Sequence, residues 1–367
     1  MRIKKIICLA LCLVMMGFAL VSCDDLEIGH YLPGYDYVPP TPDKVEYNLY
    51  IIGEDETTEN AEITVESAIN QYINSKYDTT LNIFYCDAAT YAETVAAATA
   101  DSAQNKADIV LINSASLMQS LTSAGKLVDV LPYLTDSQYK EDGFGTLNVS
   151  IDDDLLEAAK VDVNGTTKLF CIPNNHVVGE YEYVAINKDI ARFFHVSDQR
   201  LAAVKTEADA DELWAEIEPL AAYYTKETLT QEKLVKIVSG DYAYGLELVE
   251  DGWFCNVATY PTVDDDEVFS SAFGIVAGAE KPERAMEIIY AINTDVKLRN
   301  LLQYGEENKN YTMVDGLVVP ATSGNNVYRM NIIYTGDVFK AYYCELYGWN
   351  EKAAENGVHQ NDDSVLP

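Results

Sequence analysis

Hydrophobic and polar positions follow two alternating patterns in the first hundred residues after position 44. Runs of apolar and β-branched side chains, which are typical of buried strands, occur at 45–52, 81–86 and 107–112. Apolar side chains with helical spacing or composition lie between and after these runs, at 65–73, 91–103 and 116–124. This order of strand and helix predicts an α/β domain built around a parallel sheet.

The remainder of the chain keeps this alternation, with longer irregular stretches between the elements. We expect strands at 168–172, 180–186 and 234–238. We expect helices at 152–160, at 209–217 and from Pro282 onward, since proline is favoured in the first turn of a helix. The last of these helices places Ala285, Ile288, Ile289 and Ile292 on one face, which predicts that this face is buried.

The N-terminus carries the pattern of an export signal. Basic residues at positions 2, 4 and 5 precede an apolar run of 15 residues at 6–20, which is too short for a typical membrane span. The residues Leu-Val-Ser-Cys that end at Cys23 resemble the bacterial lipobox. This resemblance implies cleavage before Cys23 and lipid attachment to its sulfur. The alternative interpretation is an ordinary secretory signal followed by an unrelated cysteine.

We therefore expect residues 1–22 to be a lipoprotein signal peptide and residues 23–44 to be the lipidated cysteine with a Pro-rich tether. The tether contains four prolines and several acidic residues, a composition typical of a stiff, solvated linker. Two acyl chains on one cysteine give stable anchoring. The prediction is a protein held at the extracellular face of the bacterial cell membrane by its lipid alone.

The excess of acidic over basic residues limits the kinds of partner that the protein can bind. Asp and Glu number 59 against 25 Lys and Arg, a formal net charge of -34. Such a surface repels phosphate backbones and anionic headgroups, which excludes nucleic-acid binding and membrane binding through a basic surface. The 26 tyrosines outnumber the 10 phenylalanines. Tyrosine combines an apolar face with a polar tip, and so favours half-solvated pockets.

The four cysteines that follow Cys23 are spaced far apart and do not form a metal-ligand motif. Cys86, Cys171, Cys255 and Cys344 allow three disulfide pairings, among which the sequence does not choose. Buried free thiols are the favoured interpretation, because a chain of this length has enough core to fold without disulfides.

Motifs of catalysis are missing from the sequence. It contains no G-x-S-x-G, H-E-x-x-H, Walker or G-x-G-x-x-G motif. The acidic triplets at 152–154 and 264–266 precede helical or turn segments, where Asp caps backbone amides. Glycosidase carboxylates or calcium ligands are the less favoured interpretation of these triplets. We therefore predict that the protein is not an enzyme and has no catalytic residues, no metal site and no cofactor.

Four segments in order resemble the extracellular solute-binding proteins of ABC sugar importers, family 1, the maltose-binding-protein class. They are ADIVLINSASLMQSLTSAGKLVDVL at 107–131, KLFCIPNNHVVGEYEYVAINK at 168–188, LVKIVSGDYAYGLELVEDGWFCNVATYP at 234–261 and FGIVAGAEKPERAMEIIYAINTDVKLRNLL at 273–302. Further segments at 301–311, 334–337 and 360–361 are similar to the Firmicute lipoprotein branch of this family. Glu306, Asn308, Asn310 and Asp337 depart from the pattern of that branch.

The resemblance implies a two-lobed fold of the periplasmic-binding-protein type II class, each lobe a mostly parallel sheet flanked by helices. It implies lobe 1 at 45–145 and 273–320, and lobe 2 at 146–272 and 321–367. Only about 25 residues separate Trp214 from the strand that ends at Gly240, where relatives carry a longer helical insert. We therefore expect an abridged second lobe.

The resemblance also implies a function. A monomeric, lipid-anchored protein of this family captures a small solute, here a carbohydrate, between its lobes by hinge closure and delivers it to the transmembrane subunits of an ABC permease. The positions that match the family's ligand contacts are Glu54, Asp55, Asn113, Ser114, Asn174, Asn175, Tyr242 and Trp253.

Other functions fit the same sequence. The abridged second lobe suggests a binding module that has lost its transporter and acts as a sensor or surface component. A ligand other than a sugar also fits. A glycan-degrading enzyme is a third hypothesis, which requires two carboxylates to converge in the cleft.

Overall fold

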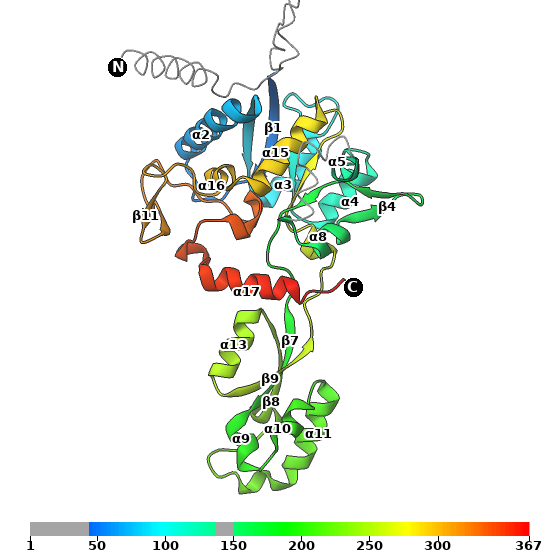
Figure 1. Ribbon diagram of the computed structural model, residues 1–367, viewed down its shortest axis with the longest axis vertical. Helices are drawn as coiled ribbons and strands as arrows, with labels where there is room; N and C mark the ends of the chain where they lie inside the picture. The colour runs from blue at the N-terminus through cyan, green and yellow to red at the C-terminus, as the bar shows by residue number, and fades with distance from the viewer. Residues whose placement is uncertain (1–43, 137–149, 367) are drawn as a thin grey trace, which may run out of the picture. The chain divides into compact units, whose positions relative to one another are not determined.

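The computed structural model describes residues 44–136 and 150–366 (Figure 1). The expected signal peptide, nearly all of the tether and the predicted lipid site Cys23 lie outside these ranges. Residues Lys44–Pro367 form one compact unit, to which the following description applies. None of the described helices is long and apolar enough to cross a bilayer.

The first sheet has five strands in the order β2-β1-β3-β10-β6. β2 (Thr79–Cys86) and β3 (Ile109–Ile112) run parallel to β1 (Val45–Ile52), which confirms the parallel sheet predicted for this region. β10 (Ala272–Ile275) is antiparallel to both β3 and β6 (Ile172–Pro173). β3 and β10 are buried at every position, as expected of strands that are covered on both faces.

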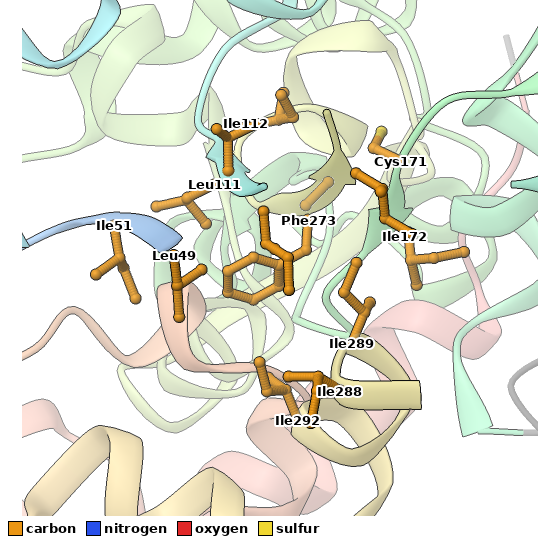
Figure 2. Close-up of a cluster of buried hydrophobic side chains, with 14 of the residues drawn as sticks. Leu49, Ile51, Leu111, Ile112, Cys171, Ile172, Phe273, Ile288, Ile289 and Ile292 are labelled. Atoms are coloured by element: carbon orange, nitrogen blue, oxygen red, sulfur yellow. The ribbon is translucent and has the colours of Figure 1, made fainter. Parts of the chain in front are cut away.

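Helices with apolar stripes cover this sheet. α2 (Glu59–Tyr77) begins where the Thr58 side chain accepts a hydrogen bond from the Ala61 amide. α15 (Pro282–Thr294) starts at Pro282 as predicted, and Figure 2 shows its Ile288 and Ile289 near Phe273 of β10. The other elements of this lobe are η2 (Ala88–Thr90), α3 (Tyr91–Ala98), α4 (Ala115–Ser123), α5 (Leu131–Thr135), α8 (Asp153–Ala158), the hairpin of β4 (Lys160–Asp162) and β5 (Thr167–Leu169), α14 (Asp265–Val268) and α16 (Val296–Tyr304).

The two acidic triplets cap helices, as the sequence predicts. Asp152 accepts hydrogen bonds from the amides of Asp154 and Leu155 at the start of α8. Asp264 does the same for Asp266 and Glu267 at the start of α14. The four cysteines are free thiols, as the favoured interpretation expects, but only Cys171 and Cys344 are buried, while Cys86 and Cys255 are half-buried. Burial raises the pKa of Cys86 to about 11 and that of Cys171 to about 12.

The second sheet has three strands in the order β8-β7-β9. β8 (Val235–Gly240) and β9 (Trp253–Thr259) are both antiparallel to the central strand β7 (Tyr181–Asn187). The expectation of a mostly parallel sheet is therefore wrong for the second lobe. β8, α13 (Tyr242–Glu250) and β9 follow one another along the chain as a strand-helix-strand unit, and the two strands are parallel, but β7 lies between them in the sheet. The order of strands and helices along a sequence does not show which strands pair.

The alternation of side chains along β7 divides the second lobe into two small cores. Tyr181, Tyr183 and Ala185 point to one face and pack with Leu248 of α13. Val184 and Ile186 point to the other face, because successive side chains of a strand lie on opposite sides. Helices on that side are α9 (Lys188–Phe193), α10 (Asp198–Ala202), α11 (Glu207–Ile217), η4 (Glu218–Tyr223) and α12 (Gln231–Leu234).

The boundary between the lobes differs from the expected one. Leu155, Ile172 and Phe269 fall within 146–272, the range expected for lobe 2, yet they pack in the same core as β1. Their side chains complete the hydrophobic cover of the first sheet, to which β6 also belongs. The second lobe therefore comprises residues 181–259, and all segments that pack on the first sheet form the first lobe.

The segment after α16 is held to the first lobe through buried polar side chains of that helix. Arg299 is fully buried and donates hydrogen bonds to the carbonyls of Ile332 and Asp337. Asn300 donates to the Lys340 carbonyl, and Gln303 donates to the Met330 carbonyl. Residues 321–367 of this region were expected in lobe 2, whereas the residues up to 320 were expected in lobe 1. Its elements are β11 (Tyr311–Val314), β12 (Leu317–Pro320), η5 (Ile332–Thr335), η6 (Val338–Lys340), η7 (Glu345–Tyr347) and α17 (Glu351–Asp362).

Candidate functional site

Polar side chains from three elements gather at the carboxyl edge of the first sheet. Glu54 follows β1 and Asn113 follows β3, and parallel neighbouring strands end at the same edge. Tyr334 of η5 lies close enough to both residues for them to affect the pKa of its phenol. Burial, and then the Glu54 charge, raises the pKa of Tyr334, while the Asn113 side chain lowers it. We call these three residues the polar edge.

The acidic loop at 54–56 makes the polar edge negative. Burial raises the pKa of Glu54, and the charges of Glu56 and Asp55 raise it further. Asp55 itself is exposed to solvent. Such a cluster offers hydrogen-bond acceptors, an amide and a phenol to a ligand, and it repels anions.

Ser114 lies beside the polar edge but its hydroxyl has a structural partner. It caps α4 by accepting a hydrogen bond of 3.3 Å from the Leu117 amide, and it contacts the Ser116 hydroxyl at 3.2 Å. A pocket of about 590 Å³ borders the start of α4. It is lined by Ala115, Ala158, Val263, Asp264, Asp265, Asp266 and Leu366.

Asn174 and Asn175 are buried in the crossing segment, which we define as residues 174–180 between β6 and β7. The Asn174 amide donates to the Ser271 hydroxyl at 2.8 Å and to the Ile333 carbonyl at 3.0 Å. The Asn175 amide donates to the Ser150 carbonyl at 3.0 Å. Because Ile333 precedes Tyr334, the Asn174 bond supports the backbone that carries the phenol of the polar edge. These contacts favour a supporting role for both asparagines over ligand contact.

Aromatic rings gather where the second lobe meets α17. Tyr181 lies at the centre, with the rings of Tyr242 and Tyr260 each 6.2 Å from its own. The Tyr242 ring stacks on His359 of α17 at 5.0 Å with an interplanar angle of 14°. The Tyr181 hydroxyl donates to Asp363 at 2.9 Å, and burial followed by this contact raises its pKa. We call Tyr181, Tyr242, Tyr260 and His359 the aromatic cluster.

Trp253 is not part of the aromatic cluster. It pairs with Asn187 at one end of β7, whereas Tyr181 begins the other end. The two positions are six residues apart along the strand, which corresponds to about 20 Å. The Lys236 ammonium lies 4.4 Å from the centroid of the Trp253 ring, an arrangement typical of a cation–π contact.

The structure thus brings Glu54 and Asn113 together and places Tyr242 among other aromatic residues. Tyr334, His359 and Tyr181 were not among the predicted site residues. Their sequence signals were indirect, namely the abundance of tyrosine and the family-like segments at 334–337 and 360–361. Within the described ranges, no three His, Cys, Asp or Glu side chains come together as metal ligands.

The fold is similar to that of solved solute-binding proteins. The N-glycan transport solute binding protein NgtS from Streptococcus pneumoniae matches with a TM-score of 0.56 and 17% identity, over 88% of this chain and 84% of NgtS. Its complexes with Man1GlcNAc and Man5GlcNAc match with TM-scores of 0.53 and 0.54 at the same identity. No protein-family model and no curated protein matches the sequence. This likeness confirms the predicted fold class.

Proposed function

We propose that this chain is the solute-binding component of an ABC transporter and captures a carbohydrate for delivery to a membrane permease. The observation that carries the proposal is the position of Glu54 and Asn113 directly after the neighbouring parallel strands β1 and β3, at the carboxyl edge of the sheet, where α/β folds bind ligands. NgtS, which shares the fold, is described as a transport protein in complex with glycans. A mono- or oligosaccharide fits the chemistry of the residues on the two lobes.

In this proposal each lobe contributes a different kind of contact. The carboxylate of Glu54, the amide of Asn113 and the phenol of Tyr334 hydrogen-bond sugar hydroxyls. The aromatic cluster stacks against the C–H faces of sugar rings. A ligand that contacts both lobes stabilises the closed arrangement by its differential affinity for it, with the crossing segment as part of the hinge.

We propose binding without catalysis. Glycoside hydrolysis generally needs two carboxyl groups on either side of the bond that is cleaved. The acidic triplets at 152–154 and 264–266 begin helices, where Asp152 and Asp264 cap backbone amides. Glu54 is accompanied by an amide and a phenol from other elements. Further parts of the proposal are lipid attachment at Cys23, a monomeric state and a place at the extracellular face of the membrane.

A second candidate function is a binding module that works without a transporter, as a sensor or surface component. The size of the second lobe favours this candidate, because residues 181–259 provide a sheet of only three strands. Neighbouring genes that encode two permease subunits would support transport. Their absence would support the independent module.

Thermal unfolding of residues 44–367 with a panel of neutral mono- and oligosaccharides, Man5GlcNAc included, tests the proposal. A ligand at 100 times its Kd stabilises the folded state by about 2.7 kcal/mol. We expect at least one glycan to raise the melting temperature, and Tyr242→Ala to abolish the shift. Tyr223→Ala is the matched control, because this tyrosine is 70% exposed on η4 and outside the aromatic cluster. A folded protein that responds to no glycan would contradict sugar capture.

A further inference from the structure

The last turns of α17 carry buried amide side chains, which is unusual for a helix near a chain end. Gln360 is 2% exposed and Asn361 is 8% exposed. Buried amides are retained where they find hydrogen-bond partners, and both side chains do so on the crossing segment. The Asn361 amide donates to the His176 carbonyl at 2.8 Å and accepts from the Val178 amide at 3.1 Å. α17 therefore completes the backbone hydrogen bonds of the crossing segment.

Gln360 connects the crossing segment to the second lobe. Its Nε2 donates to the carbonyls of Val178 at 3.0 Å and Gly179 at 2.6 Å. Its Oε1 accepts a 2.9 Å hydrogen bond from the Tyr242 amide at the first residue of α13. The preceding residue, His359, stacks on the Tyr242 ring. Figure 1 shows α17 beside the start of β7, next to α13.

Two connections join the lobes, namely the crossing segment before β7 and the segment after β9 that contains Pro261, which we call the returning connection. Gly179 has a φ of +60°, and a Cβ atom there would lie 2.9 Å from the Cβ of Pro261. Val365, just after α17, donates to the Pro261 carbonyl at 2.9 Å and accepts from the Val263 amide at 3.0 Å. The C-terminal segment is therefore bonded to both connections.

We infer that Gln360 is a positioning residue, which couples α13 and its Tyr242 to the crossing segment. The consequence for binding rests on the proposed function. With the coupling intact, movement of the crossing segment carries the ring of Tyr242 along with it. Without the coupling, the start of α13 is held less tightly, and a ligand that stacks on Tyr242 must first order it, which lowers affinity.

Hydrogen exchange of the full chain, solubilised in detergent, tests the coupling without a ligand. In Gln360→Met we expect the amides in 176–181 and 241–246 to exchange at least tenfold faster, while α15 keeps its protection. Asn70→Ala is the matched control, because the Asn70 side chain forms the same pair of bonds with the backbone of Leu81 in the first lobe. It should accelerate exchange only around 79–83. Unchanged exchange in 241–246 of Gln360→Met would overturn the coupling.

Titration with a glycan that stabilises the wild-type protein tests the consequence for binding. We expect Gln360→Met to weaken affinity about tenfold or more. Its melting temperature should also fall, because the substitution leaves two carbonyls and one amide without their hydrogen-bond partner. Gln360→Glu keeps an acceptor for the Tyr242 amide but loses the donor to both carbonyls, so it should weaken affinity as well. Faster exchange with wild-type affinity would overturn the positioning role. If no glycan binds the wild type, only the proposed function fails, and the exchange experiment still decides the coupling.

Discussion

The two lobes build their parts of the candidate site by different means. In the first lobe, Glu54 and Asn113 follow strands of a buried parallel sheet, so the backbone of the core sets their positions. In the second lobe, Tyr181 and Tyr242 begin a strand and a helix. They are held by the side chains of Asp363, which follows α17, and of Gln360 in α17. The polar edge should therefore be as rigid as its core, whereas the aromatic cluster depends on a helix from outside its own sheet.

The two lobes also differ in the size of their hydrophobic cores. The first sheet and its helices share one large core. The three strands of the second sheet separate two small cores, one under α13 and one under α9 to α12. Less buried apolar surface means a smaller free energy of unfolding for the second lobe. Substitutions placed in one lobe or the other can therefore test this difference.

The largest effects are expected from two matched leucine truncations. Leu49 in β1 and Leu213 in α11 are both fully buried, and Leu→Ala costs about 2–5 kcal/mol at such positions. We expect Leu49→Ala to lower the free energy of global unfolding. Leu213→Ala should instead speed hydrogen exchange within 181–259, while β1 and α15 stay protected. Equal loss of protection in both lobes would show that they unfold as one unit.

The next largest loss of stability is expected where the crossing segment contacts the returning connection. Gly179→Ala adds a Cβ 2.9 Å from Pro261 Cβ and 3.0 Å from the Thr262 amide, at a positive φ. We expect a loss of about 2–4 kcal/mol, measured by denaturant unfolding. Gly125→Ala is the control, because Gly125 has a φ of +64° and no atom within 4 Å. It should cost only about 1 kcal/mol. Similar losses at both positions would mean that the close contact is unimportant.

A smaller effect should come from one hydroxyl of the polar edge. Tyr334→Phe removes the phenol hydroxyl, which is an expected contact to the sugar. Loss of the proposed contact between this hydroxyl and the sugar should weaken glycan affinity about fivefold with little change in melting temperature, since a typical hydrogen bond contributes about 1 kcal/mol. Tyr72→Phe removes a hydroxyl that binds Asp295 on the first lobe, and should leave affinity unchanged. Titration calorimetry on both variants separates the two expectations.

The smallest expected effect is a dependence of stability on pH. Burial raises the pKa values of Glu54, Asp108, Asp152 and Asp337. The folded state therefore binds more protons than the unfolded state as the pH falls through these raised values, and the free energy of unfolding increases. We expect this contribution to grow as the pH falls towards the ordinary pKa of a carboxyl group, about 4, while His176, whose pKa burial lowers, opposes it below about pH 6.5. Asp108→Asn should gain less stability than the wild type over this pH range, and an equal gain in both proteins would contradict the prediction.

Much of the first lobe could be predicted because its elements are local and strongly patterned. The strands at 45–52, 81–86 and 107–112 and the helix from Pro282 are found close to where the apolar pattern places them. The parallel order of strands ending in polar residues also predicted Glu54 and Asn113 at one edge. Tyr334 was missed because it reaches that edge through bonds from Arg299 and Asn174, which are distant in sequence.

The sequence by itself therefore determined the α/β class, the strand-end residues of the polar edge and the Asp caps, because each depends on the backbone within a few residues. Tertiary structure decided the insertion of β7 between β8 and β9 and the boundary at 181–259. It also decided the separation of Trp253 from Tyr242 and the attachment of the C-terminal segment to both connections. Periodicity records which face of an element is buried, but strand partners and the targets of buried amides depend on contacts between residues far apart in the chain.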